Sequence, residues 1–438
     1  MGLPLLGETL DFFISSPSFD VHPFFEKRTN RYGRVLKTSL IGWPLVVSTD
    51  PEFNRLVFRE EGRLFESCYP ESFSKIFGQE DASELHGPRF KYLKGLFLNL
   101  LGSPNLRLTL LQDVEKEALD CLSSWTTQTS IELKSELSSM IFNVIAKKLI
   151  SFDPTKANED LKANFSAFSA GLISFPVNIP GTAYHRCLKG RKNVITMLKK
   201  LLAERKNSPR EESRDYLDLL VEELGNGSTL LNEGMALDFM FALLYASSET
   251  PSPALALAVK FLTDHADVLE ELQEEHESIT RRRKEPNSGI TWEEYKSMKF
   301  THQVISETLR LANVAPVIFR KAMKDVPVNG YIIPEGWGVM MCPTAVHLSH
   351  DIYGDPLAFN PRRWKDDTTK DDCSKYFAAF GGGIRLCVGA EFTKVVMAVF
   401  LHSLVTKCRW QAVRGGNILR TPGLGFQDGY HVRLRLKE

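Results

Sequence analysis

The feature that most constrains the fold is a long apolar stretch at residues 232–262, "NEGMALDFMFALLYASSETPSPALALAVKFL". Its apolar residues cover nearly the whole circumference of a helix, so the segment is expected to run through the core rather than along the surface. Asn232 can cap the first turn, and Glu233 suits the positive end of a helix. The pattern therefore predicts a buried helix around which the other elements must pack.

This predicted helix has a polar interruption, "SSET" at residues 247–250, which is followed by Pro251 and Pro253. The prolines lack an N–H group, so two carbonyls of the preceding turn lose their usual donors. We expect the helix to open or kink there and to leave room for water or a small ligand. Glu249 and Thr250 would then supply an acid and a hydroxyl, as a proton-delivery path requires. The alternative is a kinked helix whose polar groups satisfy one another.

The remaining periodicity is mainly helical. Charged residues spaced along apolar stripes dominate residues 88–275, and further helices are expected at 300–311 and after Ala390. No linker or repeat divides the chain, so one large, mainly α domain of residues 1–438 with a small β-rich portion is predicted. Strands are expected at about residues 34–50, with a turn at 42–44, and at about 326–341 and 418–437.

Composition excludes several classes of protein. The 54 Lys and Arg residues equal the 54 Asp and Glu residues, which gives no electrostatic reason to expect a nucleic-acid partner. Seven widely spaced cysteines without a C-x-x-C pair disfavour a disulfide framework or a zinc knuckle and fit a reducing compartment. No apolar run approaches the ~20 residues that a membrane-spanning helix needs. The start, "MGLPLLGETLDFF", lacks the features of a signal peptide and resembles the start of a trimmed chain.

One cysteine has unusual neighbours, in "FAAFGGGIRLCVGAEF" at residues 377–392. Glycines at 381–383 and Gly389 remove side chains on both sides of Cys387, which permits a flat ligand to approach the backbone. Loop N–H groups and the start of the following helix would stabilise a thiolate there. Arg385 could pair with an acidic group on the same ligand. The alternative is a glycine turn with an incidental buried thiol.

A second constellation is an acid and a base three residues apart, Glu307 and Arg310, on one face of a predicted helix. An exposed pair of this kind is worth little. The apolar neighbours indicate partial burial, and a buried pair needs further partners. "FNPRRW", at residues 359–364, offers Arg362 and Arg363 as candidates.

Together these motifs resemble the cytochrome P450 family of haem-thiolate monooxygenases. The cysteine loop is similar to the family's F-x-x-G-x-R-x-C-x-G, and "ETLR" at 307–310 to its E-x-x-R. "PRRW" at 361–364 resembles the motif that supplies a third network member, and "ASSET" at 246–250 the oxygen-binding A-G-x-D/E-T kink. The motifs follow the family's order and the resemblance covers nearly the whole chain. The matching loop residues are Phe380, Gly383, Arg385, Cys387 and Gly389.

The resemblance implies the cytochrome P450 fold and haem b (iron protoporphyrin IX) as cofactor. Cys387 would be the axial ligand of the haem iron, and its electron donation would help to split dioxygen. Glu249 and Thr250 would be catalytic through proton delivery. Glu307, Arg310 and Arg363 would form a structural network behind the haem. The implied cofactor-binding residues are Lys94, Arg320, Phe380, Gly383, Arg385 and Gly389.

Three positions depart from the family pattern. Ser247 replaces the usual glycine of the oxygen-binding groove, and Pro251 stands where a second hydroxyl residue is common. Lys94 occupies a position that is often arginine, and lysine is a point charge rather than a fork. Thr250 is retained, so oxygen activation is still expected.

"FPVNIPGTAYHRCLKGRK", at residues 175–192, resembles a signature of the plant branch that acts on sterols, triterpenoids and terpenoid hormones. This implies an endoplasmic reticulum membrane protein facing the cytosol, here without its anchor and soluble, and a monomer. Its partners would be a hydrophobic small-molecule substrate and an NADPH–cytochrome P450 reductase that passes on electrons from NADPH. The expected pocket residues are Phe175, Leu243, Ala246, Ser247, Ala315, Pro316, Val317, Ile318, Leu424 and Gly425.

Several alternative functions remain open at this point. A non-oxygenating isomerase or dehydratase of the same fold would need neither Glu249 nor Thr250. The substrate could also be a diterpenoid or a steroid hormone, and oxidation could proceed in several steps to C–C cleavage. A ligand carrier without turnover and a helical enzyme without haem are the remaining classes.

Overall fold

The computed structural model is mainly helical with small sheets, as the periodicity predicts. Its residues group into two compact units. Unit 1 comprises Met1–Ser67, Ser103–Met140 and Thr250–Glu438, and unit 2 comprises Cys68–Gly102 and Ile141–Glu249. The sequence predicts a single domain, and the division into two compact units does not test that prediction. The structure describes residues 7–40, 42–69, 75–78, 87–102, 104–153, 160–172, 174, 176–208, 215–227, 230–283, 285, 288–365, 373–421 and 423–437.

The regular elements among the described residues of unit 2 are helices, and helices α8 and α9 pack closely along one another. A Cβ atom on Gly190 of α9 would lie 2.6 Å from the carbonyl oxygen of Asn164 on α8, so only glycine permits this approach. Phe168, Phe241 and Tyr245 form an aromatic cluster with ring centroids 4.6 and 4.8 Å apart. The helices are α5 (Gly87–Gly102), α8 (Asp160–Leu172), α9 (Ala183–Asn207), α10 (Tyr216–Gly225) and α11 (Glu233–Glu249). Helix α7 (Leu133–Ile150) belongs to unit 1 up to Met140 and to unit 2 from Ile141.

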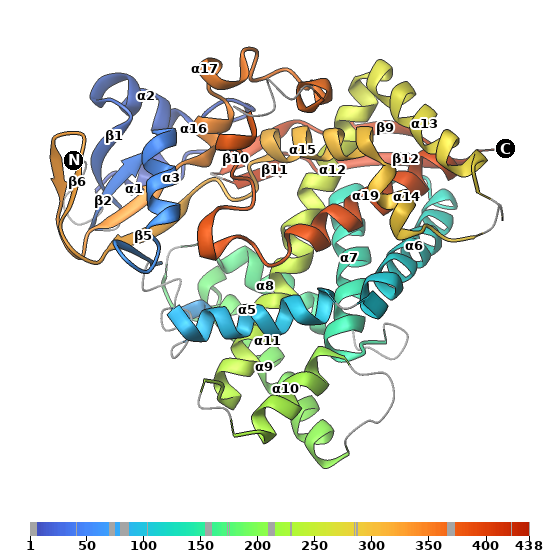
Figure 1. The fold of residues 1–438 in the computed structure, drawn as a ribbon, viewed down its shortest axis with the longest axis horizontal. Coiled ribbons are helices and arrows are strands. Elements are labelled where there is room, and N and C mark those ends of the chain that lie inside the picture. Colours follow the sequence, from blue (N-terminus) through green and yellow to red (C-terminus); the bar gives the residue numbers. More distant parts are fainter. Residues whose placement is uncertain are drawn as a thin grey trace. The chain divides into compact units, whose positions relative to one another are not determined.

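The main sheet of unit 1 has the strand order β1-β2-β8-β5-β3, and Figure 1 labels its strands β1, β2 and β5. Residues Leu40 and Trp43 pair across the first hairpin, so Trp43 and Pro44 belong to a strand and not to a turn at 42–44 as predicted. Pro44 therefore lies inside β2, where its missing N–H group is tolerated because pairing with β8 begins only at Leu45. The strands are β1 (Val35–Leu40), β2 (Trp43–Ser48), β3 (Phe65–Ser67), β5 (Ile318–Ala322) and β8 (Gly338–Met341).

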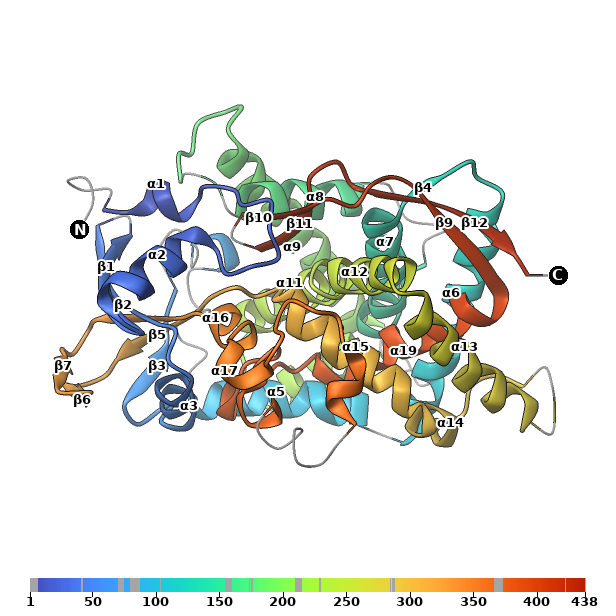
Figure 2. The ribbon, with the colours of Figure 1, turned by 90° about the horizontal axis from the view of Figure 1, so that it is seen from above.

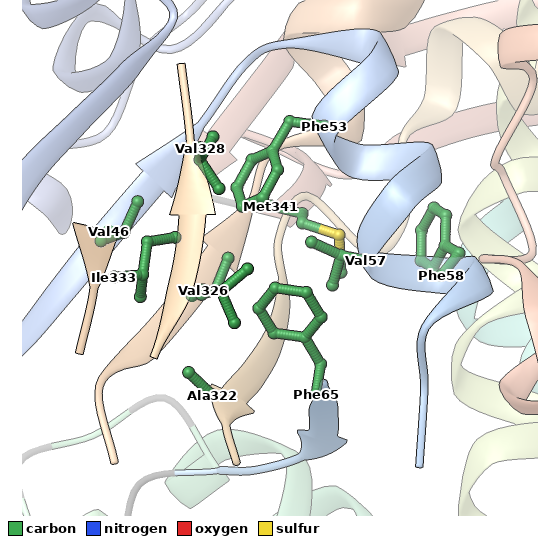
Figure 3. Packing of buried hydrophobic residues seen from close by; sticks show 11 residues of the cluster. Val46, Phe53, Val57, Phe58, Phe65, Ala322, Val326, Val328, Ile333 and Met341 are labelled. Carbon is green, nitrogen blue, oxygen red and sulfur yellow. The ribbon is translucent and has the colours of Figure 1, made fainter. Parts of the chain in front are cut away.

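Helix α3 (Pro51–Arg59) covers this sheet with its apolar face. Asp50 caps the helix, since its carboxylate accepts a 2.7 Å hydrogen bond from the backbone N–H of Phe53. Phe53 and Val57 of α3 pack with Phe65 and Met341 of the sheet (Figure 3). This packing fixes the end of α3, which contacts the cysteine loop described below.

Three smaller sheets complete the β structure. They are the two-stranded sheets β6-β7 and β10-β11 and the three-stranded sheet β4-β12-β9, all antiparallel. Their strands are β4 (Ile131–Glu132), β6 (Val326–Val328), β7 (Tyr331–Ile333), β9 (Cys408–Gly415), β10 (Ile418–Thr421), β11 (Gly423–Phe426) and β12 (Tyr430–Leu436).

The helical part of unit 1 is organised around α15, which packs against both α12 and α19 (Figure 2). Helix α19 is almost wholly buried, as expected for the apolar run after Ala390. Within the described residues, no helix combines the length and apolarity needed to cross a membrane. The helices are α1 (Thr9–Phe12), α2 (Pro23–Tyr32), α6 (Pro104–Thr126), α12 (Pro251–Asp264), α13 (Ala266–Arg281), α14 (Trp292–Ser297), α15 (Lys299–Ala312), α16 (Pro343–His347), α17 (His350–Tyr353) and α19 (Ala390–Lys407), with 3-10 helices η1 (Pro361–Trp364) and η2 (Gly383–Arg385).

The long apolar helix predicted from the sequence is interrupted where its prolines begin. Helix α11 ends at Glu249 and α12 starts at Pro251, with Thr250 between them. The side chain of Asn232 caps α11 by accepting a 2.8 Å hydrogen bond from the backbone N–H of Met235. The loss of two backbone donors thus divides one apolar stretch into two helices.

Candidate active site

The cysteine loop presents its sulfur at the surface of unit 1. Cys387 lies between η2 and α19, and its backbone N–H donates a 3.0 Å hydrogen bond to the carbonyl of Phe380. Cys387 is exposed, whereas the other six cysteines are buried or half-buried. The flanking apolar side chains of Ile384 and Leu386 are 37% and 45% exposed. The loop therefore offers a thiol on an apolar surface, which suits an apolar ligand better than water.

Two of the loop glycines are required by helix α3. Gly383 has a φ of +62°, and a Cβ atom there would lie 2.1 Å from the carbonyl oxygen of Phe58. A Cβ on Gly382 would come within 2.9 Å of the Phe58 ring. The sequence led us to expect that these glycines clear space for a ligand, but their close contact is with α3. Gly389 is the glycine next to the sulfur, with a Cβ position 3.8 Å from Cys387 Sγ.

A buried carboxylate, Glu61, joins the two arginines expected at the haem propionates. Arg385 Nε donates a 3.2 Å hydrogen bond to Glu61 Oε1. Arg320 Nε, from strand β5, lies 2.5 Å from Glu61 Oε2, close enough for an ion pair, yet neither of these buried atoms makes a well-directed hydrogen bond. Sequence reasoning missed Glu61, because a second glutamate after a helix end is typical of a solvent-exposed turn.

The E-x-x-R pair is fully buried. Arg310 donates from Nε and Nη2 to the two carboxylate oxygens of Glu307, each at 2.9 Å. Arg363 Nε donates to Glu307 Oε1, also at 2.9 Å. Arg362 instead forms exposed ion pairs with Asp267 and Glu271. The structure therefore brings together the three residues predicted as a network and separates them from Arg362.

Further donors saturate Glu307. Trp364 Nε1 donates to Oε2 at 2.9 Å, and the backbone N–H of Asn360 donates to Oε1 at 3.0 Å. The sequence indicated that a buried pair would need more partners but did not identify these two. A carboxylate with this many donors is held in one position, as a buried charge requires.

The predicted residues on α11 lie in unit 2, where Leu243 is buried, Ala246 is exposed, and Ser247 and Glu249 are half-buried. Ser247 Oγ donates to the carbonyl of Leu243 at 2.6 Å, so this hydroxyl is satisfied within its own helix. Thr250, the first residue of the adjoining part of unit 1, is exposed.

Two predicted pocket segments of unit 1 lie side by side. The segment after α15 contains exposed Ala315 and half-buried residues 316–318, and half-buried residues 424–425 belong to β11. A Cβ on Gly423 would be 3.8 Å from the carbonyl oxygen of Val314, so the two segments are in contact. The predicted pocket residue Phe175 lies outside the described residues.

Lys94, the remaining residue expected to contact a haem propionate, lies on α5 in unit 2. Its Nζ atom is 5.9 Å from the ring centroid of Phe90. Its role toward the cofactor therefore stays a prediction.

The described residues around Cys387 fit a haem. The exposed thiol with its apolar flanks suits a flat, apolar metal complex. Arg320, Arg385 and Glu61 together carry two positive charges and one negative charge, which favours an anionic group such as a propionate. Together with the mainly helical fold, these features are those of a protein that can bind haem.

Comparison with known proteins establishes the family. The profile of the family "Cytochrome P450" matches residues 2–427. The chain belongs to the cytochrome P450 family, and it is a haem b-dependent monooxygenase.

The similar proteins agree with this assignment. The chain is 53% identical to Cytochrome P450 87A3 of Oryza sativa subsp. japonica, over 99% of this chain and 85% of that protein. It is 41% identical to Cucurbitadienol 11-hydroxylase of Siraitia grosvenorii and 40% identical to Beta-amyrin 16-alpha-hydroxylase CYP87D16 of Maesa lanceolata, each over 100% of this chain and 92% of the relative. The solved structure of retinoic acid-bound cyanobacterial CYP120A1 superposes with a TM-score of 0.87 at 26% identity, covering 100% of this chain and 98% of that one.

Proposed function

We propose that this protein inserts one oxygen atom from dioxygen into an unactivated C–H bond of a triterpenoid or a sterol. The observation that carries the proposal is its 40–41% identity, over its full length, to hydroxylases named for cucurbitadienol and beta-amyrin. The stretch at residues 175–192, which resembles the same plant branch, supports it. The electrons come from NADPH through a flavoprotein reductase, and the protein acts at the endoplasmic reticulum membrane.

The proposed roles follow from the chemistry of the residues. The thiolate of Cys387 would hold the haem iron, and Arg320 and Arg385 would hold the propionates, with Lys94 as a further cation. When bound, haem b supplies the oxidising chemistry, which the thiolate ligand promotes. Glu249 and Thr250 hold and pass on protons during the reaction. The hydroxyl of Ser247 is hydrogen-bonded within its own helix, so we assign the proton relay to the hydroxyl of Thr250.

The substrate is proposed to lie against side chains with little polar character. Ala315, Pro316, Val317 and Ile318 follow α15, and Leu424 and Gly425 come from the adjacent hairpin. Leu243 and Ala246, which the sequence also predicts as pocket residues, lie on α11 in unit 2. An apolar lining with few polar anchors suits a polycyclic hydrocarbon skeleton, which is bound by shape and desolvation.

Turnover with isotopically labelled dioxygen tests this function. The holoprotein is combined with reductase, NADPH and a panel of sterols, triterpenoids, diterpenoids and steroid hormones, and products are analysed by mass spectrometry. The proposal predicts that a triterpenoid or sterol gains one labelled oxygen atom. Isomerisation or dehydration without label would contradict it, and so would tight binding of these compounds without turnover.

A further inference from the structure

A histidine that the haem-thiolate assignment does not use, His347, is buried within unit 1. It is the last residue of α16 and is fully buried. The backbone N–H of Ala378 donates a 2.9 Å hydrogen bond to His347 Nε2. Since a backbone N–H can only donate, Nε2 must be the unprotonated nitrogen, and Nδ1 carries the proton. Nδ1 lies 2.7 Å from Asn313 Oδ1 and donates to it.

The other end of this connection is the arginine of the E-x-x-R pair. Asn313 ends α15 in a left-handed conformation with φ +43°, and its side-chain Nδ2 donates to the carbonyl of Arg310 at 2.7 Å. Arg310 Nη1 in turn donates to the carbonyl of His347 at 2.7 Å. Arg310, Asn313 and His347 therefore form a closed ring of hydrogen bonds that has one orientation.

Ala378 connects this ring to the cysteine loop. Its carbonyl accepts a 2.9 Å hydrogen bond from the N–H of Gly381, and the carbonyl of Phe380 accepts from the N–H of Cys387. Phe377, the residue before Ala378, also packs against the His347 ring, with ring centroids 5.5 Å apart. The single side chain of His347 thus fixes where the loop that carries the sulfur begins.

The imidazole is held in its neutral form by its surroundings. Burial, and to a smaller extent the positive charge of Arg310, lower the pKa of His347 to about 3. A protonated ring would direct a second N–H group at the N–H of Ala378. Only the neutral tautomer can both donate to Asn313 and accept from Ala378.

We propose that His347 is a positioning residue that couples the Glu307–Arg310 pair to the cysteine loop and so maintains thiolate ligation by Cys387. The inference rests on the haem-thiolate role proposed for Cys387 but not on the identity of the substrate. It predicts that disturbing His347 affects the state of the iron ligand more than the stability of the fold.

The test compares two ways of replacing the ring. His347→Gln can still present a carbonyl oxygen to the N–H of Ala378, whereas His347→Asn is shorter and retains only the arm toward Asn313. The readout is the absorbance of the reduced, carbon monoxide-bound protein, which separates thiolate-ligated from non-thiolate forms. In His347→Asn the buried N–H of Ala378 loses its acceptor, and the ratio of thiolate-ligated to non-thiolate protein is expected to fall about tenfold. In His347→Gln much of this ratio is expected to be restored.

The matched control is His276→Leu, which removes another buried histidine of unit 1. His276 is hydrogen-bonded to Thr301 Oγ1 at 3.0 Å and to His402 Nδ1 at 2.9 Å, outside the ring described above. The free energy of unfolding of each variant is measured by denaturant titration, so that variants of equal stability can be compared. Equal thiolate ratios in His347→Asn and in an equally destabilised control would overturn the inference, as would no difference between the Asn and Gln variants.

The wild-type protein separates this inference from the proposed function. A wild-type thiolate band that responds to the His347 variants supports the inference even where no triterpenoid or sterol is oxidised, an outcome that contradicts only the substrate proposal. A correctly folded, haem-supplied wild type without the thiolate band would overturn both.

Discussion

At the scale of single residues, the buried carboxylate of Glu307 accepts hydrogen bonds from donors that lie far apart in the sequence. Glu307 accepts hydrogen bonds from Arg310, Arg363 and Trp364, each at 2.9 Å. None of these side chains is expected to touch substrate. Their contribution is to hold the segments before the cysteine loop, since Arg310 also donates to backbone carbonyls there.

Replacing Glu307 is therefore expected to disrupt the protein more than replacing an exposed acid. Glu307→Gln leaves two arginines without their buried counter-charge and should cost about 3–5 kcal/mol of the free energy of unfolding. Arg362→Gln is the control, because it breaks only exposed ion pairs worth about 0–1 kcal/mol. Chemical denaturation of both variants measures the difference, and equal losses would contradict the account of the network.

Thr250 is the residue whose loss should affect chemistry without affecting the fold. Thr250→Ala removes the relay hydroxyl, so protons reach oxygen less selectively and NADPH oxidation should yield more hydrogen peroxide per product formed. Ser247→Ala is the matched control, because the hydroxyl of Ser247 is bonded within its helix. Peroxide and product are measured together. Unchanged coupling in Thr250→Ala would remove this residue from the relay.

At the scale of elements, the tighter of the two glycine contacts between α3 and the cysteine loop is that of Gly383. A Cβ at Gly383 would lie 2.1 Å from the carbonyl oxygen of Phe58, and its φ of +62° is itself unfavourable for other residues. Gly383→Ala is expected to displace the cysteine loop and lower haem retention. Gly381→Ala is the control, with a similar φ of +72° but its nearest atom 3.9 Å away. Similar haem retention in both variants would show that strain alone, and not the contact with α3, matters.

The packing of α13, α15 and α19 includes a buried histidine pair, His276 and His402, that should make stability depend on pH. Burial lowers the pKa of His276 to about 3 and that of His402 to about 4, from an ordinary value of 6.5. The unfolded chain thus binds more protons than the folded protein below pH 6.5, so stability is fully present above this pH and is lost as the pH falls toward 4.

Removing one histidine of the pair tests this linkage. His276→Leu should reduce the slope of unfolding free energy against pH between about pH 4 and 6, by up to roughly 1.4 kcal/mol per pH unit. The slope is obtained from denaturation midpoints at a series of pH values. A slope equal to that of the wild type would show that His276 is not the group responsible.

At the scale of the whole molecule, local sequence patterns predicted the structural features that depend only on residues close together in the sequence. The spacing of Glu307 and Arg310, the prolines after Thr250 and the apolar run after Ala390 each determine structure within a few turns, and the structure has them as expected. Only resemblance to the family distinguished Arg363 from Arg362.

What the sequence could not predict depends on tertiary contact. Glu61 and Arg385 are 324 residues apart in the chain, and the contacts of His347 join segments separated by 34 and 31 residues. The periodicity of apolar residues in the sequence gives no information about such tertiary contacts. The same reason explains why the sequence did not indicate that Gly383 also makes room for Phe58 of a distant helix.

The central claim is that Cys387 binds the haem iron as a thiolate, and the absorbance of the reduced, carbon monoxide-bound protein tests it most directly. The account predicts a thiolate-type band in the wild type and its loss in Cys387→Ser, with Cys68→Ser as a control that keeps the band. A haem-loaded wild type without this band, or a Cys387→Ser variant that retains it, would contradict the account.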